Sequence, residues 1–199
     1  FMFHVGFSNY LELRKKWVSW KASEKNTSPD EILNGWNKKY EASIKDDFLQ
    51  WIDNEIALVI VEPDQMDFHD DIMVWVSSTD AEKITSNLSN FCLKVDNENQ
   101  NELYSITFKE HTINKLNLPD FLSNTLGDQF QLLQDNYFTQ IEDYIVFANS
   151  PATLQWTINR IEAEKTLEKD PNYQAFENRI SAESNIFIYS NIGGSLSIY

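Results

Sequence analysis

Segments of strand length follow one another in the middle of this sequence, instead of alternating strictly with helices. Residues 103–108, 110–116, 129–133 and 137–141 are short runs separated by polar turn residues, as in antiparallel strands joined by turns. Helical patterns precede and follow this region. Because the strands come in runs, the sequence predicts an α+β fold in which helices pack on an antiparallel β-sheet.

Two further segments each join a strand directly to a helix. Residues 71–77 alternate as a half-buried strand, and Thr79 is then expected to cap a helix, with a glutamate three positions later. Residues 144–148 form the second strand, after which Ser150 is the expected cap and Pro151 the first helical residue. These units predict two similar strand–helix halves.

The first 45 residues are expected to be a helical N-terminal part of the same domain. Leu13, Trp17 and Trp20 recur at helical spacing, which predicts a face buried in the core. The basic residues 14–16 are then expected on the wet side of that helix. Ser28 and the proline after it predict the start of a second helix, because proline lacks the amide that would have no partner there.

The chain of 199 residues is predicted to form one domain, since it has only five glycines and five prolines and no flexible linker. Its most polar interval, 96–102, is expected to be a surface loop. Because it begins at Phe1 without an initiator methionine or signal peptide, we expect a fragment of a longer precursor. No run of 18 apolar residues is present, so a membrane link is expected only through a missing N-terminal signal or anchor.

The charge and the single cysteine exclude several classes of function. Lysine and arginine number 16 against 31 acidic residues, for a net charge of −15, which repels phosphates and predicts no nucleic-acid partner. Cys92 cannot form an internal disulfide. It follows an apolar helix face, and we expect a buried, unreactive thiol.

The densest group of ligand-type side chains lies between two predicted strands. Asp64, Asp67, His69 and Asp71 fall within eight positions and could supply ligands to a cation, but their order differs from that of a calcium-binding loop. Turns also collect aspartate for backbone reasons, so a solvated loop is the favoured interpretation and no cofactor is expected. The sequence lacks a Gly-x-Ser-x-Gly motif and does not predict an enzyme.

Trp75 and Trp156 lie away from the apolar stripes of their own segments. Trp75 falls on the strand face opposite Val74 and Val76, and Trp156 lies off the predicted stripe of its helix. Indole rings can cover a second packing layer, stack on a sugar or contact a partner. Both residues are therefore candidates for a ligand-binding surface.

Several segments resemble an uncharacterised bacterial family, domain of unknown function 3352. The resemblance rests on structural caps and core positions in the segments DYIVFANSPATLQWTINRI (143–161), KTLEKDPNYQAF (165–176), SNIFIYSN (184–191) and DDFLQWIDNEIALV (46–59). It covers about 46–191 and supplies no active-site residue. It implies an extracytoplasmic protein, in the periplasm or cell envelope.

Three hypotheses of function remain open at this point. The first is a non-enzymatic extracytoplasmic binding or scaffolding domain with an unknown protein or glycan partner. The second is a carbohydrate- or lipid-binding domain, which would bring Trp75 and Trp156 together in one concave patch. The third is a metal-dependent hydrolase, which would bring His69 together with Asp64, Asp67 and Asp71.

Overall fold

The computed structural model describes residues 1–24, 28–61, 72–177 and 185–190. The strands are β1 (Met2–Gly6), β2 (Ile52–Ile60), β3 (Ile72–Ser78), β4 (Ser105–Phe108), β5 (His111–Leu116), β6 (Asn136–Ile141), β7 (Tyr144–Ala148) and β8 (Ile186–Tyr189). The α-helices are α1 (Tyr10–Glu24), α2 (Pro29–Lys39), α3 (Ile44–Asp47), α4 (Ala81–Asn99), α5 (Phe121–Thr125), α6 (Pro151–Glu162) and α7 (Pro171–Glu177). Three short 3₁₀ helices are also present in these ranges: η1 (Leu49–Trp51), η2 (Asp128–Phe130) and η3 (Leu167–Lys169).

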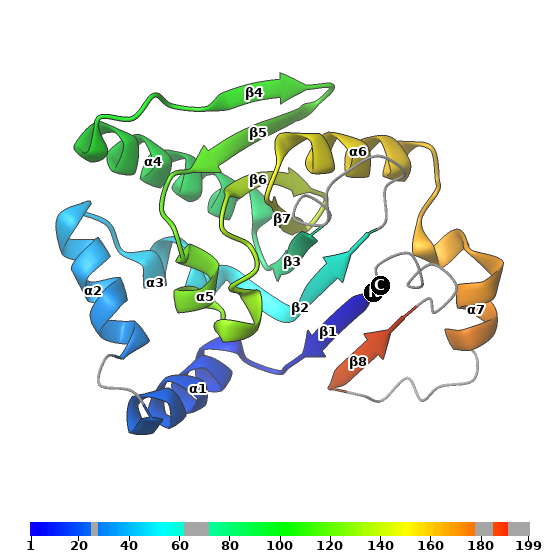
Figure 1. The fold of residues 1–199 in the computed structure, drawn as a ribbon, viewed down its shortest axis with the longest axis horizontal. Coiled ribbons are helices and arrows are strands. Elements are labelled where there is room, and N and C mark those ends of the chain that lie inside the picture. Colours follow the sequence, from blue (N-terminus) through cyan, green and yellow to red (C-terminus); the bar gives the residue numbers. More distant parts are fainter. Residues whose placement is uncertain (25–27, 62–71, 178–184, 191–199) are drawn as a thin grey trace.

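The strands form one eight-stranded sheet in the order β4-β5-β6-β7-β3-β2-β1-β8 (Figure 1). Every neighbouring pair is antiparallel. This confirms the predicted α+β class with an antiparallel sheet. Two meanders, the three-stranded β1–β2–β3 and the four-stranded β4–β5–β6–β7, meet where β3 pairs with β7, from Met73 opposite Ala148 to Ser77 opposite Tyr144.

Helices cover both faces of the sheet. On one face, Val74 and Phe147 pack with Leu88 of α4 and Phe121 of α5 in the larger core, to which α1, α2 and α3 also contribute. On the other face, Val146 and its neighbours pack beneath α6 in a smaller core. Both predicted strand–helix units form, but α4 and α6 lie on opposite faces (Figure 1).

The buried face of α1 differs from the one that the apolar spacing predicts. Leu13 and Trp20 are 40% and 57% exposed, whereas Tyr10 and Val18 are buried. The spacing of Leu13, Trp17 and Trp20 does place them on one side of the helix, but that side is turned away from the core. The expectation of a buried stripe is therefore wrong.

Cations occupy part of the face that α1 buries. Arg14, expected on the wet side, is only 8% exposed and donates from Nη1 to Asp30 at 2.6 Å and from Nε to the Thr125 carbonyl at 3.2 Å. Lys21 is similarly buried and pairs with Asp128. Long aliphatic stems can pack against apolar neighbours while the charged ends reach acidic partners, so these residues fill core positions.

Two other segments depart from the prediction. Residues 96–102 begin within α4, which continues to Asn99, and the buried Asp96 accepts a hydrogen bond from Asn117 Nδ2 at 2.8 Å. Residues 129–133 contain part of η2 rather than a strand, and Phe130 and Leu133 point into the larger core. Short apolar runs fit a buried turn as well as a strand, which explains the second error.

The helix caps are mostly where the sequence places them. Ser150 caps α6 by accepting from the Thr153 amide at 3.2 Å, as predicted. The cap of α4 is Asp80 rather than Thr79, because Asp80 Oδ1 accepts from the Lys83 amide at 2.9 Å. The N-terminal 45 residues are largely helical, but they also contain β1.

We expect Phe121→Ala to lower the free energy of unfolding by about 3–5 kcal/mol, since it removes a ring from the fully buried core. The ring centroid of Phe121 lies 5.5 Å from that of Phe48 and 6.2 Å from that of Phe91. Denaturant titration followed by circular dichroism measures the change. Leu132→Ala, at an exposed position, is the control, and equal losses in the two variants would contradict this account of the core.

Candidate functional site

Trp75 lies at the centre of the sheet, on the face that carries the smaller core. It is half-buried, and its side chain points away from Val74 and Val76, as the strand alternation predicts. Its ring meets Tyr144 of β7 edge to face, with centroids 5.7 Å apart and an angle of 71°. The geometry is a favourable arrangement for two aromatic rings.

Tyr144 also begins a chain of polar contacts across the sheet. Its hydroxyl donates to Oε1 of Glu55 on β2. Oε2 of Glu55 lies 2.7 Å from Nε2 of His4 on β1. Three strands thus bring a phenol, a carboxylate and an imidazole together beside Trp75, and we refer to Trp75, Tyr144, Glu55 and His4 as the sheet-face cluster.

Small residues at the intervening positions let these long side chains cross the sheet. Ser77 lies opposite Tyr144 on β3, and its hydroxyl accepts from the Glu55 amide at 2.9 Å. Ala57 stands in register between His4 and Trp75. Gly6 stands opposite Glu55, and a Cβ atom there would lie 3.9 Å from the His4 ring. Larger residues in this row would occupy space next to the cluster.

Burial raises the pKa of the Tyr144 phenol above its usual range, and the hydrogen bond and charge of Glu55 raise it further. The phenol therefore remains a neutral donor at physiological pH. The side chains of His4 and Glu55 are 26% and 32% exposed, so both remain accessible to solvent. The cluster offers hydrogen-bonding groups and aromatic surface at one place on rigid strands.

Trp156 does not join this cluster through any contact found among the described residues. It is half-buried on α6, off the stripe of Leu154 and Ile158, and the Arg160 guanidinium carbon lies 5.0 Å from its ring centroid. Residues four apart on a helix are neighbours, so this cation covers the indole locally. The two tryptophan candidates thus have separate surroundings, and a ligand site on the sheet face would use Trp75 without Trp156.

The proposed metal ligands Asp64, Asp67, His69 and Asp71 lie outside the described residues, so the metal-dependent hydrolase stays a prediction. Within the ranges that the structure describes, no three histidine, cysteine, aspartate or glutamate side chains gather as a metal site. The helices in those same ranges include none with the length and apolar character required to cross a membrane.

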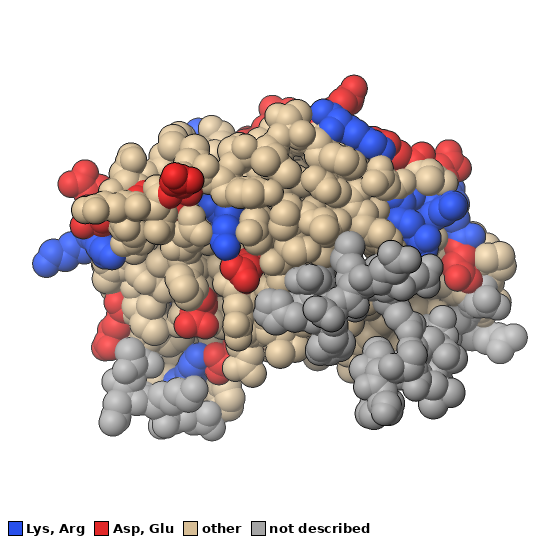
Figure 2. Space-filling model, turned by 45° about the horizontal axis from the view of Figure 1, so that its top comes forward, with Lys and Arg blue, Asp and Glu red and all other residues tan. Residues whose placement is uncertain are grey.

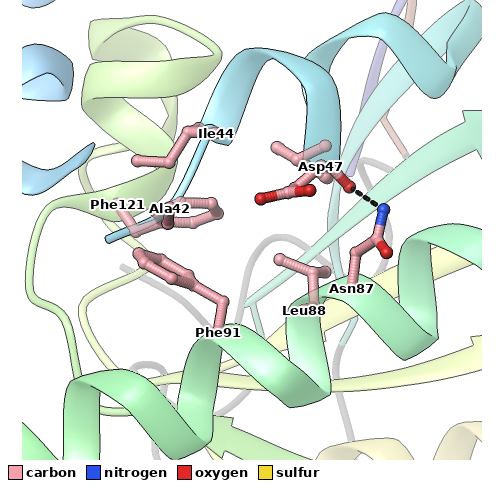
Figure 3. Close-up of a pocket in the computed structure, with 8 residues that line it drawn as sticks. Ala42, Ile44, Asp47, Asn87, Leu88, Phe91 and Phe121 are labelled. Carbon is pink, nitrogen blue, oxygen red and sulfur yellow. Dashed lines mark hydrogen bonds between the residues drawn. The ribbon is translucent and has the colours of Figure 1, made fainter. Parts of the chain in front are cut away.

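A hollow lies between α3 and α4. It holds about 10 Å³, and a neighbouring groove of about 410 Å³, which shares Asp47, Asn87 and Phe91 with it, extends to Lys94. Figure 3 shows Phe91 and Phe121 on one side and Asp47 and Asn87 on the other. Asn87 of α4 donates to the Asp47 carbonyl of α3 at 3.0 Å, and Lys94 of α4 donates to the Glu41 carbonyl, between α2 and α3, at 2.6 Å. These polar groups hold α4 against α3 and the turn that precedes it.

Sequence reasoning did not find Glu55, Tyr144 or His4 as site residues. Glu55 and His4 are 51 positions apart, and Glu55 and Tyr144 are 89 apart, so no local motif joins them. The one sequence signal for these site residues was that polar side chains stand at strand positions that are usually apolar. Strand order and register were needed to bring them together.

The fold and the cluster define an α+β domain whose antiparallel sheet carries a polar and aromatic face. The chain belongs to the family described as "Protein of unknown function (DUF3352)", whose model matches residues 12–197. This confirms the resemblance seen in 46–191 and extends it through most of the N-terminal helices. No curated protein and no solved structure matches the chain.

We expect Cys92 to resist thiol reagents while the protein is folded. The side chain is fully buried, and burial together with the nearby Asp96 carboxylate raises the pKa of the thiol to about 12. At about pH 8 the thiolate that reacts is therefore scarce and inaccessible. A thiol reagent that releases a chromophore on reaction should detect one thiol by absorbance, and only after denaturant is added. Rapid labelling of Cys92 in the folded protein would contradict the structure.

Tyr144→Phe should weaken the fall in stability at alkaline pH. The raised pKa in the folded state means that the unfolded chain loses its phenolic proton first, so the free energy of unfolding falls as pH rises above about 10. Below about pH 10 the phenol keeps its proton in both the folded and the unfolded chain, so the contribution of Tyr144 to stability is fully present there. Urea titrations at several pH values compare the slopes, and indistinguishable slopes in variant and wild type would contradict the assignment.

Proposed function

We propose that this domain is a non-enzymatic binding module whose ligand contacts the sheet-face cluster. The observation that carries the proposal is the edge contact of Trp75 with Tyr144 beside the paired side chains of Glu55 and His4. Ligand sites commonly combine aromatic surface with a few fixed polar groups, and these four residues supply both. Because strands carry them, they need little reorganisation on binding.

The chemistry of the cluster favours a neutral sugar or similar polyol. The aromatic rings suit the C–H face of a sugar. The Glu55 carboxylate can accept from hydroxyl groups, and the His4 imidazole can exchange hydrogen bonds with them. The net charge of −15 disfavours anionic ligands, and on the face shown in Figure 2 lysines and arginines form small groups among acidic and uncharged residues.

An extracytoplasmic location is part of the same proposal. A glycan ligand is consistent with the cell-envelope location that the family resemblance implies. Cell fractionation with an antibody against the domain tests this location separately from binding. Recovery in the cytoplasmic fraction alone would contradict it.

We expect Trp75→Ala to weaken binding of a neutral glycan at least about tenfold, because it removes the aromatic surface. A glycan array with neutral and acidic sugars identifies the probe, and calorimetry then compares the variants. Trp156→Ala is the matched control and should bind as the wild type does.

A second variant separates loss of the site from loss of the fold. Glu55→Gln retains an oxygen that can accept from Tyr144 but removes the charge. It should also weaken binding, and circular dichroism checks that both variants fold. Failure of all neutral sugars to bind the folded wild type, or unchanged binding by both variants, would overturn the proposal.

A further inference from the structure

Strand β8 forms one edge of the described sheet, where it pairs with β1 on one side only (Figure 1). The Gly6 amide of β1 donates to the Asn185 carbonyl at 2.8 Å, so the backbone groups of Asn185 and, by alternation, of Phe187 face β1. The amides and carbonyls of Ile186 and Ile188 therefore point outward. None of the backbone hydrogen bonds between described residues reaches this outer edge.

The same two residues of β8 present apolar side chains to solvent. Ile186 and Ile188 are 59% and 57% exposed. Ile188 stands opposite Phe3, which packs against the larger core, so both isoleucines lie on that face of the sheet. Outward backbone groups beside exposed isoleucines are suited to the addition of another strand.

Strand β8 lacks the features that protect a sheet edge from pairing. Residues 185–190 contain no charge and no proline, and their register with β1 runs without a bulge. The opposite edge, β4, differs, because its exposed residues Ser105 and Thr107 are polar and Lys109 and Glu110 follow it directly. An edge without such protection is usually covered in the native protein. We therefore expect another strand to pair with β8.

We propose that this strand is β8 of a second copy of the chain, paired antiparallel about a two-fold axis. With Phe187 of each copy at the axis, Ile186 of one copy lies opposite Ile188 of the other. Both isoleucines have outward backbone groups, so each such pair exchanges two hydrogen bonds. Their exposed side chains also become cross-strand neighbours and leave solvent together.

Other pairings match β8 less well. Pairing with β4 of another copy would place the isoleucines beside Ser105 and Thr107, and it would continue from copy to copy without closing. The uncharged segment 185–190 keeps like charges away from the centre of a symmetric interface, although each copy carries −15. A strand of another protein would need the same apolar spacing, which β8 itself supplies. Because the strand is short, we expect a weak dimer that dissociates on dilution.

This pairing would place two sheet-face clusters on one surface. A two-fold axis perpendicular to the sheet keeps the smaller-core face of both copies on the same side. His4 stands opposite Phe187, so the backbones of the two His4 residues would be three strand spacings apart, or about 14 Å. The dimer would then bind a repeating glycan at two points, a consequence that rests on the proposed function, whereas the pairing itself does not.

Sedimentation of the purified chain over a range of concentrations tests the pairing without any ligand. We expect a monomer–dimer equilibrium, and Ile188→Lys should raise its dissociation constant at least about tenfold, because a charge would be buried without a partner. Ile188→Pro should act in the same direction, because it removes an outward amide but no bond to β1. Leu132→Lys, at an exposed site elsewhere, and Thr107→Pro, at an exposed position of β4, are the matched controls and should dimerise as the wild type does.

Disulfide crosslinking then tests the register. Chains carrying Ile186→Cys are mixed with chains carrying Ile188→Cys and oxidised, while the native Cys92 is buried and does not compete. These positions would have Cα atoms about 5.5 Å apart across the axis, within reach of a disulfide, so the mixed product should exceed its share from random pairing. Circular dichroism checks that each variant folds. Monomer at every concentration, dimerisation unchanged by both Ile188 variants, or an excess of self-linked products would overturn the proposal.

Discussion

The pairing of β3 with β7 is the contact on which the rest of the fold depends. It joins the two meanders, and its residues supply both cores: Val74 and Phe147 are fully buried on one face, and Val146 on the other. Each strand leads directly into one of the longer helices, α4 or α6, and those helices lie on opposite faces. Val74, Phe147 and Val146 are therefore intolerant of polar substitutions, since a polar side chain there would be buried without a hydrogen-bond partner and the apolar packing would be lost.

Features set by local chemistry could be predicted from the sequence. Ser150 caps α6, because a hydroxyl before a proline at the first helical position satisfies a free amide whatever the tertiary context. The alternation in β3 likewise placed Trp75 on the face opposite Val74. The same caps and strand positions carried the family resemblance, so family and fold class could be recognised without any knowledge of function.

Features set by tertiary contacts could not be predicted in the same way. The spacing of Leu13, Trp17 and Trp20 correctly predicted that these residues share one side of α1, but not that this side faces away from the core. Which side is buried depends on Asp30 and Asp128, which accept the buried cations of the helix. The sheet-face cluster could not be predicted from the sequence for a similar reason. Its side chains come from strands whose order and register are set by long-range pairing, and only Trp75 departed from its own segment's pattern.

The sheet-face cluster and the larger core lie on opposite sides of the sheet, and this arrangement has a physical consequence. The cluster stands on the face with the smaller core, whereas α1 and α4 pack on the larger core through Tyr10 and Leu88. Among the described residues, the contacts within the cluster run between the strands β1, β2, β3 and β7. A ligand on the cluster would therefore affect the helices of the larger core only through a second arrangement of the β3–β7 pair. The complete burial of Val74, Val146 and Phe147 in that pair opposes such a change.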